Sequence, residues 1–464
     1  MLRLWNLYRA SSSIRHAQRL SRPEMLALQE KRWRAAARRA FASSPYYQRC
    51  LSGLNLDLCS LSEIPVLTKA MLVKHWDEIV PDARLHWKEL EQHLKDPRNW
   101  HKLLHGRWMV SMTSGTSGAA IAIPNDITSV DWNHAAHAVR NGPSPHGASA
   151  PGISLFGKRP VAASFICSAV PSVSASLLHT RPWIGSLFCD YRPISVTAPW
   201  NDILQQVQEM QPDILIGYAS IIGRLAQAKL DGALRLELPQ SKGAISTGGD
   251  TLTPGIRQLC RDAFGIEPLN GYGCGEALGI ARQWPGMEHM VVFEDLAVFE
   301  GVDAKEQECG PGILSDHALV TPFFNTALPL LRYRIDDRVS FGPAPGGWPF
   351  KTILELSGRS ALTYTFRVPE KRIFVGTNFL SVMEHQPEVS AYQFRQTAPD
   401  ALECRFVAQT GASREEIRAT LEASIRRCLV DAECADVRSE VIPVHYLDAD
   451  PRSGKVEQNV PLKE

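Results

Sequence analysis

Short apolar runs alternate with helical segments through the middle of this 464-residue chain, and this alternation restricts the fold more than any other feature. The helical segments "WNDILQQVQEM" and "PGIRQLCRDAF" place apolar residues on one side of a helix. The apolar runs have the length and composition of strands, and they are "PGISLF", "DILIGY", "KGAISTGG" and "MVVFEDLAVF". The pattern predicts an α/β fold, with sheet strands that end in loops and helices that flank them.

The pattern changes after about residue 358. "SAYQFRQ", "ECRFVAQ" and "VIPVHYL" read as strands, and a helix begins after Ser413, which forms a capping box with Glu416 and precedes an apolar face. A chain of 464 residues is too long for one ordinary core. We therefore predict a large N-terminal α/β domain over residues 1–358 and a small α+β C-terminal domain over residues 359–464.

Charge and composition exclude several classes of partner. The chain has 50 Lys+Arg against 49 Asp+Glu, which gives no basic field of the size that nucleic acid requires. Its longest apolar run, residues 214–223, is far shorter than the ~20 residues of a membrane span. The ten cysteines show neither Cys-x-x-Cys nor zinc-ligand spacing and read as reduced thiols. We expect a small-molecule substrate, no nucleic-acid or membrane partner, and a cytoplasmic location.

The first 23 residues allow two interpretations. They contain five arginines, three consecutive serines and no acidic residue before Glu24, which is typical of a mitochondrial presequence. No small-residue cleavage site follows an apolar core, so an amphipathic N-terminal helix with a basic outer face is the favoured interpretation.

The stretch "MVSMTSGTSGAAIAIPND" concentrates hydroxyl groups and glycines in six residues. Such a loop can present backbone N–H and side-chain O–H donors to a polyphosphate without steric obstruction. A flexible turn is the alternative. Neither a Walker A motif nor a G-x-S-x-G elbow is present, and Glu276 occupies the last glycine position of a G-x-G-x-x-G fingerprint. The six residues are Thr113, Ser114, Gly115, Thr116, Ser117 and Gly118.

The order of the later motifs resembles the adenylate-forming (acyl- and aryl-CoA synthetase) superfamily, and within it the phenylacetate–coenzyme A ligase and CapK-like branch. The resemblance covers the chain from about residue 25 to its end. After the hydroxyl-rich loop, the motifs are "AISTGGDTLTP", "LNGYGCGEALGIA", "LVTPFFNTALPLLRYRIDDRVSF", "ILELSGRS" and "DPRSGKVEQNV".

The resemblance implies an ATP- and Mg²⁺-dependent ligase with a mobile C-terminal domain. Such an enzyme activates a carboxylic acid, here an aromatic one, as an acyl-adenylate. It then transfers the acyl group to a phosphopantetheine thiol of coenzyme A or a carrier protein. An amine or other nitrogen acceptor, and a degenerate nucleotide-binding homologue without turnover, remain as alternatives.

The resemblance also assigns roles to individual residues. The hydroxyl-rich loop would hold the departing pyrophosphate, and Lys455 would be the catalytic lysine of the C-terminal domain. The other assignments are Glu276 to magnesium, Tyr272 to the adenine ring, Gly249 and Asp250 to the nucleotide, Asp337 to the ribose hydroxyls, and Arg359 to the hinge.

For several of these residues an ordinary structural role is the alternative: a surface acid at Glu276, ion pairs of Asp337 with Arg334 or Arg338, and a turn lysine at Lys455. The acyl pocket is the least defined part. The residues named for it are Trp132, Phe156, Trp183, Phe188 and Tyr218, with His134, His137 and His179 ambiguous.

This chain also departs from the superfamily pattern at five places. Ala119-Ala120 replaces Lys-Pro after the loop, Gly275 replaces a hydroxyl residue before Glu276, and Ser360-Ala361-Leu362 replaces acidic hinge residues. In addition, Asp250 stands in place of a glutamate and Asp336 in place of a glycine.

Overall fold

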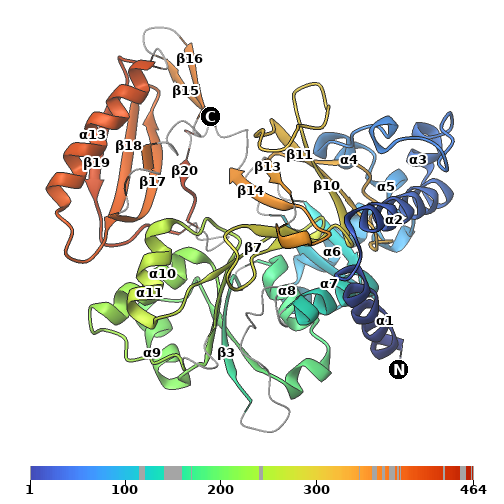
Figure 1. The fold of residues 1–464 in the computed structure, drawn as a ribbon, viewed down its shortest axis with the longest axis horizontal. Helices are drawn as coiled ribbons and strands as arrows, with labels where there is room; N and C mark the ends of the chain where they lie inside the picture. Colours follow the sequence, from blue (N-terminus) through green and yellow to red (C-terminus); the bar gives the residue numbers. More distant parts are fainter. Residues whose placement is uncertain are drawn as a thin grey trace. The chain divides into compact units, whose positions relative to one another are not determined.

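The computed structural model describes most of the chain in two compact units (Figure 1). The residues outside the description are 1, 114–120, 141–158, 169, 240–243, 344, 358–362, 368–370, 376–381, 384–385, 387, 432–433, 450–455, 461 and 463–464. Unit 1 comprises Met1–Gly157, Cys167–Phe188 and Leu269–Leu356, and unit 2 comprises Lys158–Ile166, Cys189–Pro268 and Ser357–Glu464.

Unit 1 combines an N-terminal group of helices with antiparallel strands. One sheet runs β10-β11-β12, β1 pairs with β2, and β7, β8, β9 and β14 are antiparallel neighbours in that order. The helices are α1 (Leu2–Ala17), α2 (Arg22–Ser43), α3 (Pro45–Cys50), α4 (Lys69–Lys74), α5 (Trp76–Ile79), α6 (Trp87–Lys95), α7 (Ile127–Arg140) and α8 (Val173–His179). The strands are β1 (Trp108–Met112), β2 (Ala122–Asp126), β7 (Leu269–Cys274), β8 (Leu278–Arg282), β9 (Met290–Val292), β10 (Ala297–Val302), β11 (His317–Pro322), β12 (Tyr333–Ile335), β13 (Arg338–Gly342) and β14 (Thr352–Ser357).

Unit 2 contains the parallel α/β part and the C-terminal sheet. Strands β6-β5-β3-β4 are parallel neighbours, and the C-terminal sheet runs β19-β18-β17-β20 with α13 packed on it (Figure 1). The helices are α9 (Trp200–Met210), α10 (Ala219–Leu230), α11 (Pro254–Phe264) and α13 (Arg414–Asp431). The strands are β3 (Val161–Ile166), β4 (Asp190–Ser195), β5 (Ile214–Gly217), β6 (Ala244–Gly248), β15 (Thr363–Arg367), β16 (Lys371–Val375), β17 (Val389–Ala398), β18 (Ala401–Ala408), β19 (Arg438–Pro443) and β20 (Asn459–Val460).

The predicted α/β fold class is confirmed. Helices α9 and α11 have the bounds that their sequence patterns predict, and α13 begins after Ser413, whose hydroxyl accepts from the Glu416 N–H at 3.3 Å. The run "PGISLF" lies outside the described residues. The division at residue 359 stays a prediction; within unit 2, the Thr253 hydroxyl at the start of α11 donates to the Ser390 carbonyl of the C-terminal sheet at 2.9 Å.

One predicted strand is wrong. The run "MVVFEDLAVF" was expected to be continuous, but β9 ends at Val292 and β10 begins at Ala297. Glu294 and Asp295 lie between them, buried, and form ion pairs with Arg22 and Arg140. Two buried carboxylates need cationic partners, so the chain turns at this point to reach them.

The N-terminal segment is a helix that packs into unit 1. Ala10, Ile14 and Ala17 of α1 are fully buried, and the Arg3 guanidinium forms an ion pair with the buried Asp131 of α7 at 2.5 Å. Figure 1 shows α1 alongside α7. In the part of the chain that the structure describes, no helix has both the length and the apolar character needed to cross a bilayer.

Candidate active site

The β7–β8 turn carries two of the functional candidates, Tyr272 and Glu276, within five residues. Tyr272 lies on β7 together with Cys274, and Glu276 lies in the turn to β8. The turn is tight because a Cβ atom on Gly273 would lie 2.2 Å from the Leu278 carbonyl oxygen, and Leu278 itself has a left-handed φ of 59°. Glycine at 273 is therefore required for the turn that presents Glu276.

Tyr272 and Asp337 are brought together by this turn. The Tyr272 hydroxyl donates to Asp337 Oδ2 at 2.5 Å, although the two residues are 65 positions apart. The pKa of Tyr272 is raised, first by burial and then by the Asp337 charge, so the hydroxyl keeps its proton and acts as a donor. The neighbouring Asp336 instead accepts from Arg334 Nε at 3.1 Å. Of the two neighbouring aspartates, Asp336 forms an ion pair with Arg334, and Asp337 accepts from Tyr272.

Glu276 is half-buried among groups that hold their protons. Burial is the main cause of the raised pKa of the Cys274 thiol, and the Glu276 charge adds to it. The pKa of Tyr333 is raised for the same two reasons, and its hydroxyl is hydrogen-bonded to Glu276. Two protonated neighbours can donate to one carboxylate, which fixes its direction.

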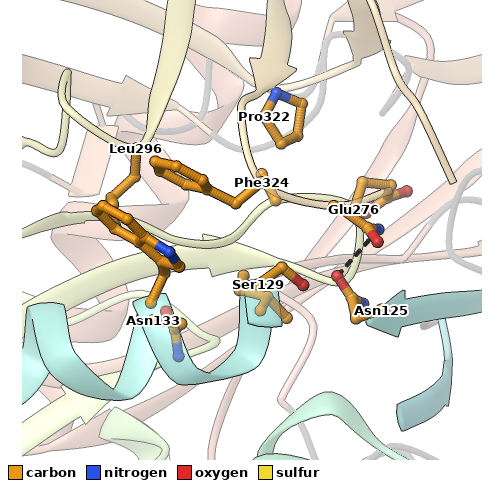
Figure 2. Close-up of a pocket in the computed structure, with 11 residues that line it drawn as sticks. Asn125, Ser129, Asn133, Glu276, Leu296, Pro322 and Phe324 are labelled. Carbon is orange, nitrogen blue, oxygen red and sulfur yellow. Dashed lines mark hydrogen bonds between the residues drawn. The ribbon is translucent and has the colours of Figure 1, made fainter. Parts of the chain in front are cut away.

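A pocket in unit 1 opens beside Glu276 (Figure 2). At one end, the indole of Trp132 stacks on Phe324 with ring centroids 3.8 Å apart and planes 10° from parallel. The complete lining is Asn125, Ser129, Trp132, Asn133, Glu276, Ala277, Leu278, Leu296, Pro322, Phe324 and Asn325.

Two asparagines brace the loop that carries Glu276, and the sequence analysis did not identify either. Asn125 Nδ2 donates to the Gly275 carbonyl at 3.2 Å, and Asn325 Nδ2 donates to Asn125 Oδ1 at 3.2 Å. Both side chains are buried. Asn125 is the fourth residue of the "AIPND" strand, and Asn325 lies in the quoted "FFNTALP" motif. A polar residue inside each apolar stretch was the available signal.

The missing hydroxyl at Gly275 does not reflect a lack of space. A Cβ atom at this position would meet Val173 Cγ2 at 3.4 Å and Ile123 Cγ1 at 3.7 Å, which are ordinary van der Waals distances. The backbone here therefore accommodates a serine.

Thr113 and the hairpin around it define where the hydroxyl-rich loop begins and ends. The Thr113 N–H donates to the Ile121 carbonyl at 2.9 Å, and Thr113 Oγ1 accepts from the Ile121 N–H at 3.0 Å. These bonds continue the antiparallel β1–β2 ladder. The remaining predicted residues of the loop, together with Arg359 and Lys455, lie outside the described residues; the loop residues are Ser114, Gly115, Thr116, Ser117 and Gly118.

Gly249 and Asp250 follow β6 in unit 2. Gly249 has a φ of 87°, which favours glycine. The Asp250 carboxylate accepts from the backbone N–H groups of Ala219 at 2.5 Å and Ser220 at 3.1 Å. It therefore caps the N-terminus of α10, where a negative charge is stabilised by the helix dipole.

The residues named for the acyl pocket have different environments. Trp132 lines the pocket beside Glu276, whereas Trp183 is 66% exposed. Tyr218 is buried at the start of α10, Phe188 is partly exposed, and Phe156 lies outside the described residues. His134 and His137 are partly buried in α7, and desolvation there lowers the pKa of each to about 3, so both are neutral at pH 7. His179 stacks on His101 with centroids 4.2 Å apart.

The described residues fit a cation held by a single carboxylate. Within the described ranges, no group of three or more His, Cys, Asp or Glu side chains could hold a metal ion. Glu276 offers one carboxylate in a half-buried turn. Magnesium is commonly bound by one or two carboxylates together with substrate phosphates and water, so this arrangement suits it when a nucleotide is present.

Comparison with known proteins gives a fold and a short sequence match. No protein-family model matches the chain. Protein CapK of Staphylococcus aureus is 30% identical over 136 residues, which is 29% of this chain and 28% of that relative's length. A 2-hydroxyisobutyryl-CoA ligase in the postadenylation state with R3-HIB-AMP superposes with a TM-score of 0.68 at 16% identity, covering 97% of this chain and 91% of the ligase. The same ligase with 2-HIB-AMP and CoA in the thioesterification state gives a TM-score of 0.56 at 15% identity, covering 96% and 91%.

Proposed function

Because this chain has the fold of the adenylate-forming superfamily, as its motifs predicted, we propose that it activates a carboxylic acid with ATP. The acid forms an acyl-adenylate, and its acyl group is then transferred to a phosphopantetheine thiol of coenzyme A or a carrier protein. The observation that carries the proposal is the arrangement around the β7–β8 turn. It combines the Tyr272–Asp337 hydrogen bond with a separate carboxylate, Glu276, next to a pocket.

The chemistry needs hydrogen-bond acceptors for the ribose hydroxyls of the nucleoside and a fixed positive charge for the phosphates. Asp337 keeps lone pairs free after accepting from Tyr272, and these would accept from the two ribose hydroxyls. Glu276 would hold magnesium, which when bound neutralises charge on the phosphates. In the first step a carboxylate oxygen attacks the α-phosphorus of ATP, the bond to the β-phosphate oxygen breaks, and pyrophosphate leaves.

In the second step the thiolate attacks the acyl carbon, the bond to the adenylate oxygen breaks, and AMP leaves with that electron pair. The hydroxyl-rich loop, with Gly249, Arg359 and Lys455, would bind and neutralise the nucleotide. For Asp250 we propose an indirect role through the start of α10, because its carboxylate already caps that helix. We place the reaction in the cytoplasm.

The acid is proposed to be aromatic, by resemblance to the phenylacetate–coenzyme A ligase branch. The test is acid-dependent exchange of labelled pyrophosphate into ATP, run with phenylacetate, benzoates, short 2-hydroxy acids and fatty acids. Exchange with aryl acids supports the full proposal, and exchange with another class corrects the substrate alone. Absence of exchange with every acid, together with measurable AMP binding, would identify a nucleotide-binding homologue without turnover.

The acceptor is tested separately. The acid that supports exchange is incubated with ATP and either coenzyme A, a phosphopantetheine carrier protein or a set of amines. Thioester formation supports the thiol proposal, whereas amide formation with neither thiol consumed would assign the nitrogen acceptor.

A further inference from the structure

The three most exposed aromatic side chains in the described part of the chain lie in two neighbouring segments of unit 1. Trp5 and Tyr8 of α1 are 61% and 64% exposed, and Trp183 of the short helix η4 (Trp183–Leu187) is 66% exposed. The rings of Trp5 and Tyr8 stack on each other with centroids 5.8 Å apart. Soluble monomers seldom expose large apolar groups together unless the surface has a partner.

A hydrogen bond joins α1 to the residue at the end of α8, three positions before η4 begins. Arg3 Nη2 donates to the Thr180 carbonyl at 2.9 Å, while its guanidinium is paired with buried Asp131. The opposite side of α1 is buried through Ala10 and Ile14. The exposed face is therefore held by the fold rather than free to turn inward. We call this surface, with Trp5, Tyr8 and Trp183 at its centre, the α1–η4 surface.

The charged side chains of the first 23 residues have one sign. Arg9, Arg15 and Arg19 are exposed, and none of the three has an ion-pair partner among the described residues. The sequence has no acidic residue before Glu24. A second copy of the chain is a poor occupant, because a twofold interface would place the arginines of one copy against those of the other.

We propose that the α1–η4 surface binds peripherally to an anionic lipid membrane. Tryptophan and tyrosine favour the headgroup region of a bilayer, and arginine is attracted to anionic headgroups on the cytoplasmic leaflet. The sequence-based expectation of no membrane partner came from the lack of a spanning segment, and a helix that lies in the interface needs none. This proposal is independent of the proposed reaction.

The test is co-sedimentation of the purified full chain with vesicles of phosphatidylcholine alone or with about 30% phosphatidylglycerol. We expect binding to the anionic vesicles and little to the neutral ones, with a marked loss when salt rises from about 0.05 M to about 0.5 M. Trp5→Ser combined with Tyr8→Ser should lower the partition coefficient by about tenfold. Arg9→Glu combined with Arg15→Glu should lower it by a similar factor through charge alone.

Matched controls are Leu58→Ser, which removes a 79% exposed apolar side chain elsewhere in unit 1, and Arg98→Glu, which reverses an exposed charge outside the surface. Both should bind vesicles as the wild type does. The proposal is overturned if the wild type ignores anionic vesicles or if both double variants bind normally. A dimer in size-exclusion chromatography that the Trp5→Ser/Tyr8→Ser variant dissociates would assign the surface to a second copy instead.

Discussion

One partly buried side chain, that of Tyr272, links the sequence motif around β7 to the motif around β12 and β13 through its hydroxyl. Its bond to Asp337 Oδ2 fixes the rotation of the carboxylate and satisfies part of its acceptor capacity. The superfamily resemblance assigns the Tyr272 ring to stacking on adenine. The Tyr272 hydroxyl is not needed for that stacking, and it can orient Asp337 at the same time. Tyr272 is in this sense a positioning residue for Asp337.

Tyr272→Phe keeps the ring and removes the hydroxyl. A hydrogen bond to a charged group is worth about 1.5–3 kcal/mol, so we expect the KM for ATP to rise by about tenfold or more while kcat falls less. The rise should disappear with 2′,3′-dideoxy-ATP, which lacks the hydroxyls that Asp337 would accept from. Tyr333→Phe is the matched control, because its hydroxyl bonds to Glu276 and its loss should alter magnesium dependence instead. An unchanged KM for ATP in Tyr272→Phe would show that the Tyr272–Asp337 hydrogen bond does not contribute to nucleotide binding.

Gly275→Ser tests whether the missing hydroxyl limits catalysis. The space at this position allows a Cβ atom without backbone movement, so the melting temperature should change little. A hydroxyl facing phosphate would add about 1.5–3 kcal/mol to a step in which charge develops, which predicts a pyrophosphate exchange rate about tenfold higher. Gly273→Ser is the structural control and should disrupt the turn, because its Cβ atom would overlap the Leu278 carbonyl. A slower pyrophosphate exchange in Gly275→Ser with an intact fold would show that a hydroxyl at this position does not assist the phosphate step in this chain.

At the scale of elements, sequence patterns predicted the bounds of a helix correctly where local capping residues determine them. Helix α11 begins at Pro254 after a Thr253 cap and ends at Phe264, before the C-cap Gly265 with a φ of 66°. These residues are readable start and stop signals. The break between β9 and β10 was missed, because it depends on Arg22 and Arg140 from distant parts of the chain.

The site shows the same limit. Motif order located Tyr272, Glu276 and Asp337, but the bracing pair Asn125 and Asn325 comes from segments 200 residues apart. No local pattern reports such a contact, since a polar residue in an apolar stretch reveals burial but not its partner.

Helix α7 carries a pH-dependent part of the stability of unit 1. His134 and His137 are partly buried and neutral, with folded pKa values lowered to about 3 by desolvation, whereas an unfolded histidine titrates near 6.5. Between these values the unfolded chain binds more protons than the folded chain. The free energy of unfolding should therefore fall as pH decreases below about 6.5, by up to about 1.4 kcal/mol per pH unit for each histidine.

Urea unfolding at pH 7.5 and 5 measures this loss. His137→Gln should reduce the difference between the two pH values, while His16→Gln, which changes an exposed histidine of α1, should leave it as in the wild type. An equal pH dependence in His137→Gln and the wild type would show that His137 is not the group responsible.

At the scale of the whole molecule, the proposal depends on a lysine delivered by the C-terminal region. By resemblance, Lys455 acts only while the adenylate forms. Lys455→Ala should slow that half-reaction by about two to three orders of magnitude, as expected for the loss of one fixed charge near the phosphates. Transfer from a supplied acyl-adenylate should change little. Equal losses in both half-reactions, with the fold intact, would contradict a role confined to adenylation.

The central claim is that the chain joins a carboxylate to the α-phosphate of ATP. The most direct measurement is a single-turnover reaction with ATP labelled at the α-phosphorus, the best acid and no thiol or amine acceptor, quenched and separated for nucleotides. The proposal predicts labelled acyl-adenylate bound to the protein in an amount that approaches the enzyme concentration, with an equal release of pyrophosphate. Label found only in ADP, with the γ-phosphate recovered as an acyl phosphate, would contradict it, because the acid would then have attacked the γ-phosphorus.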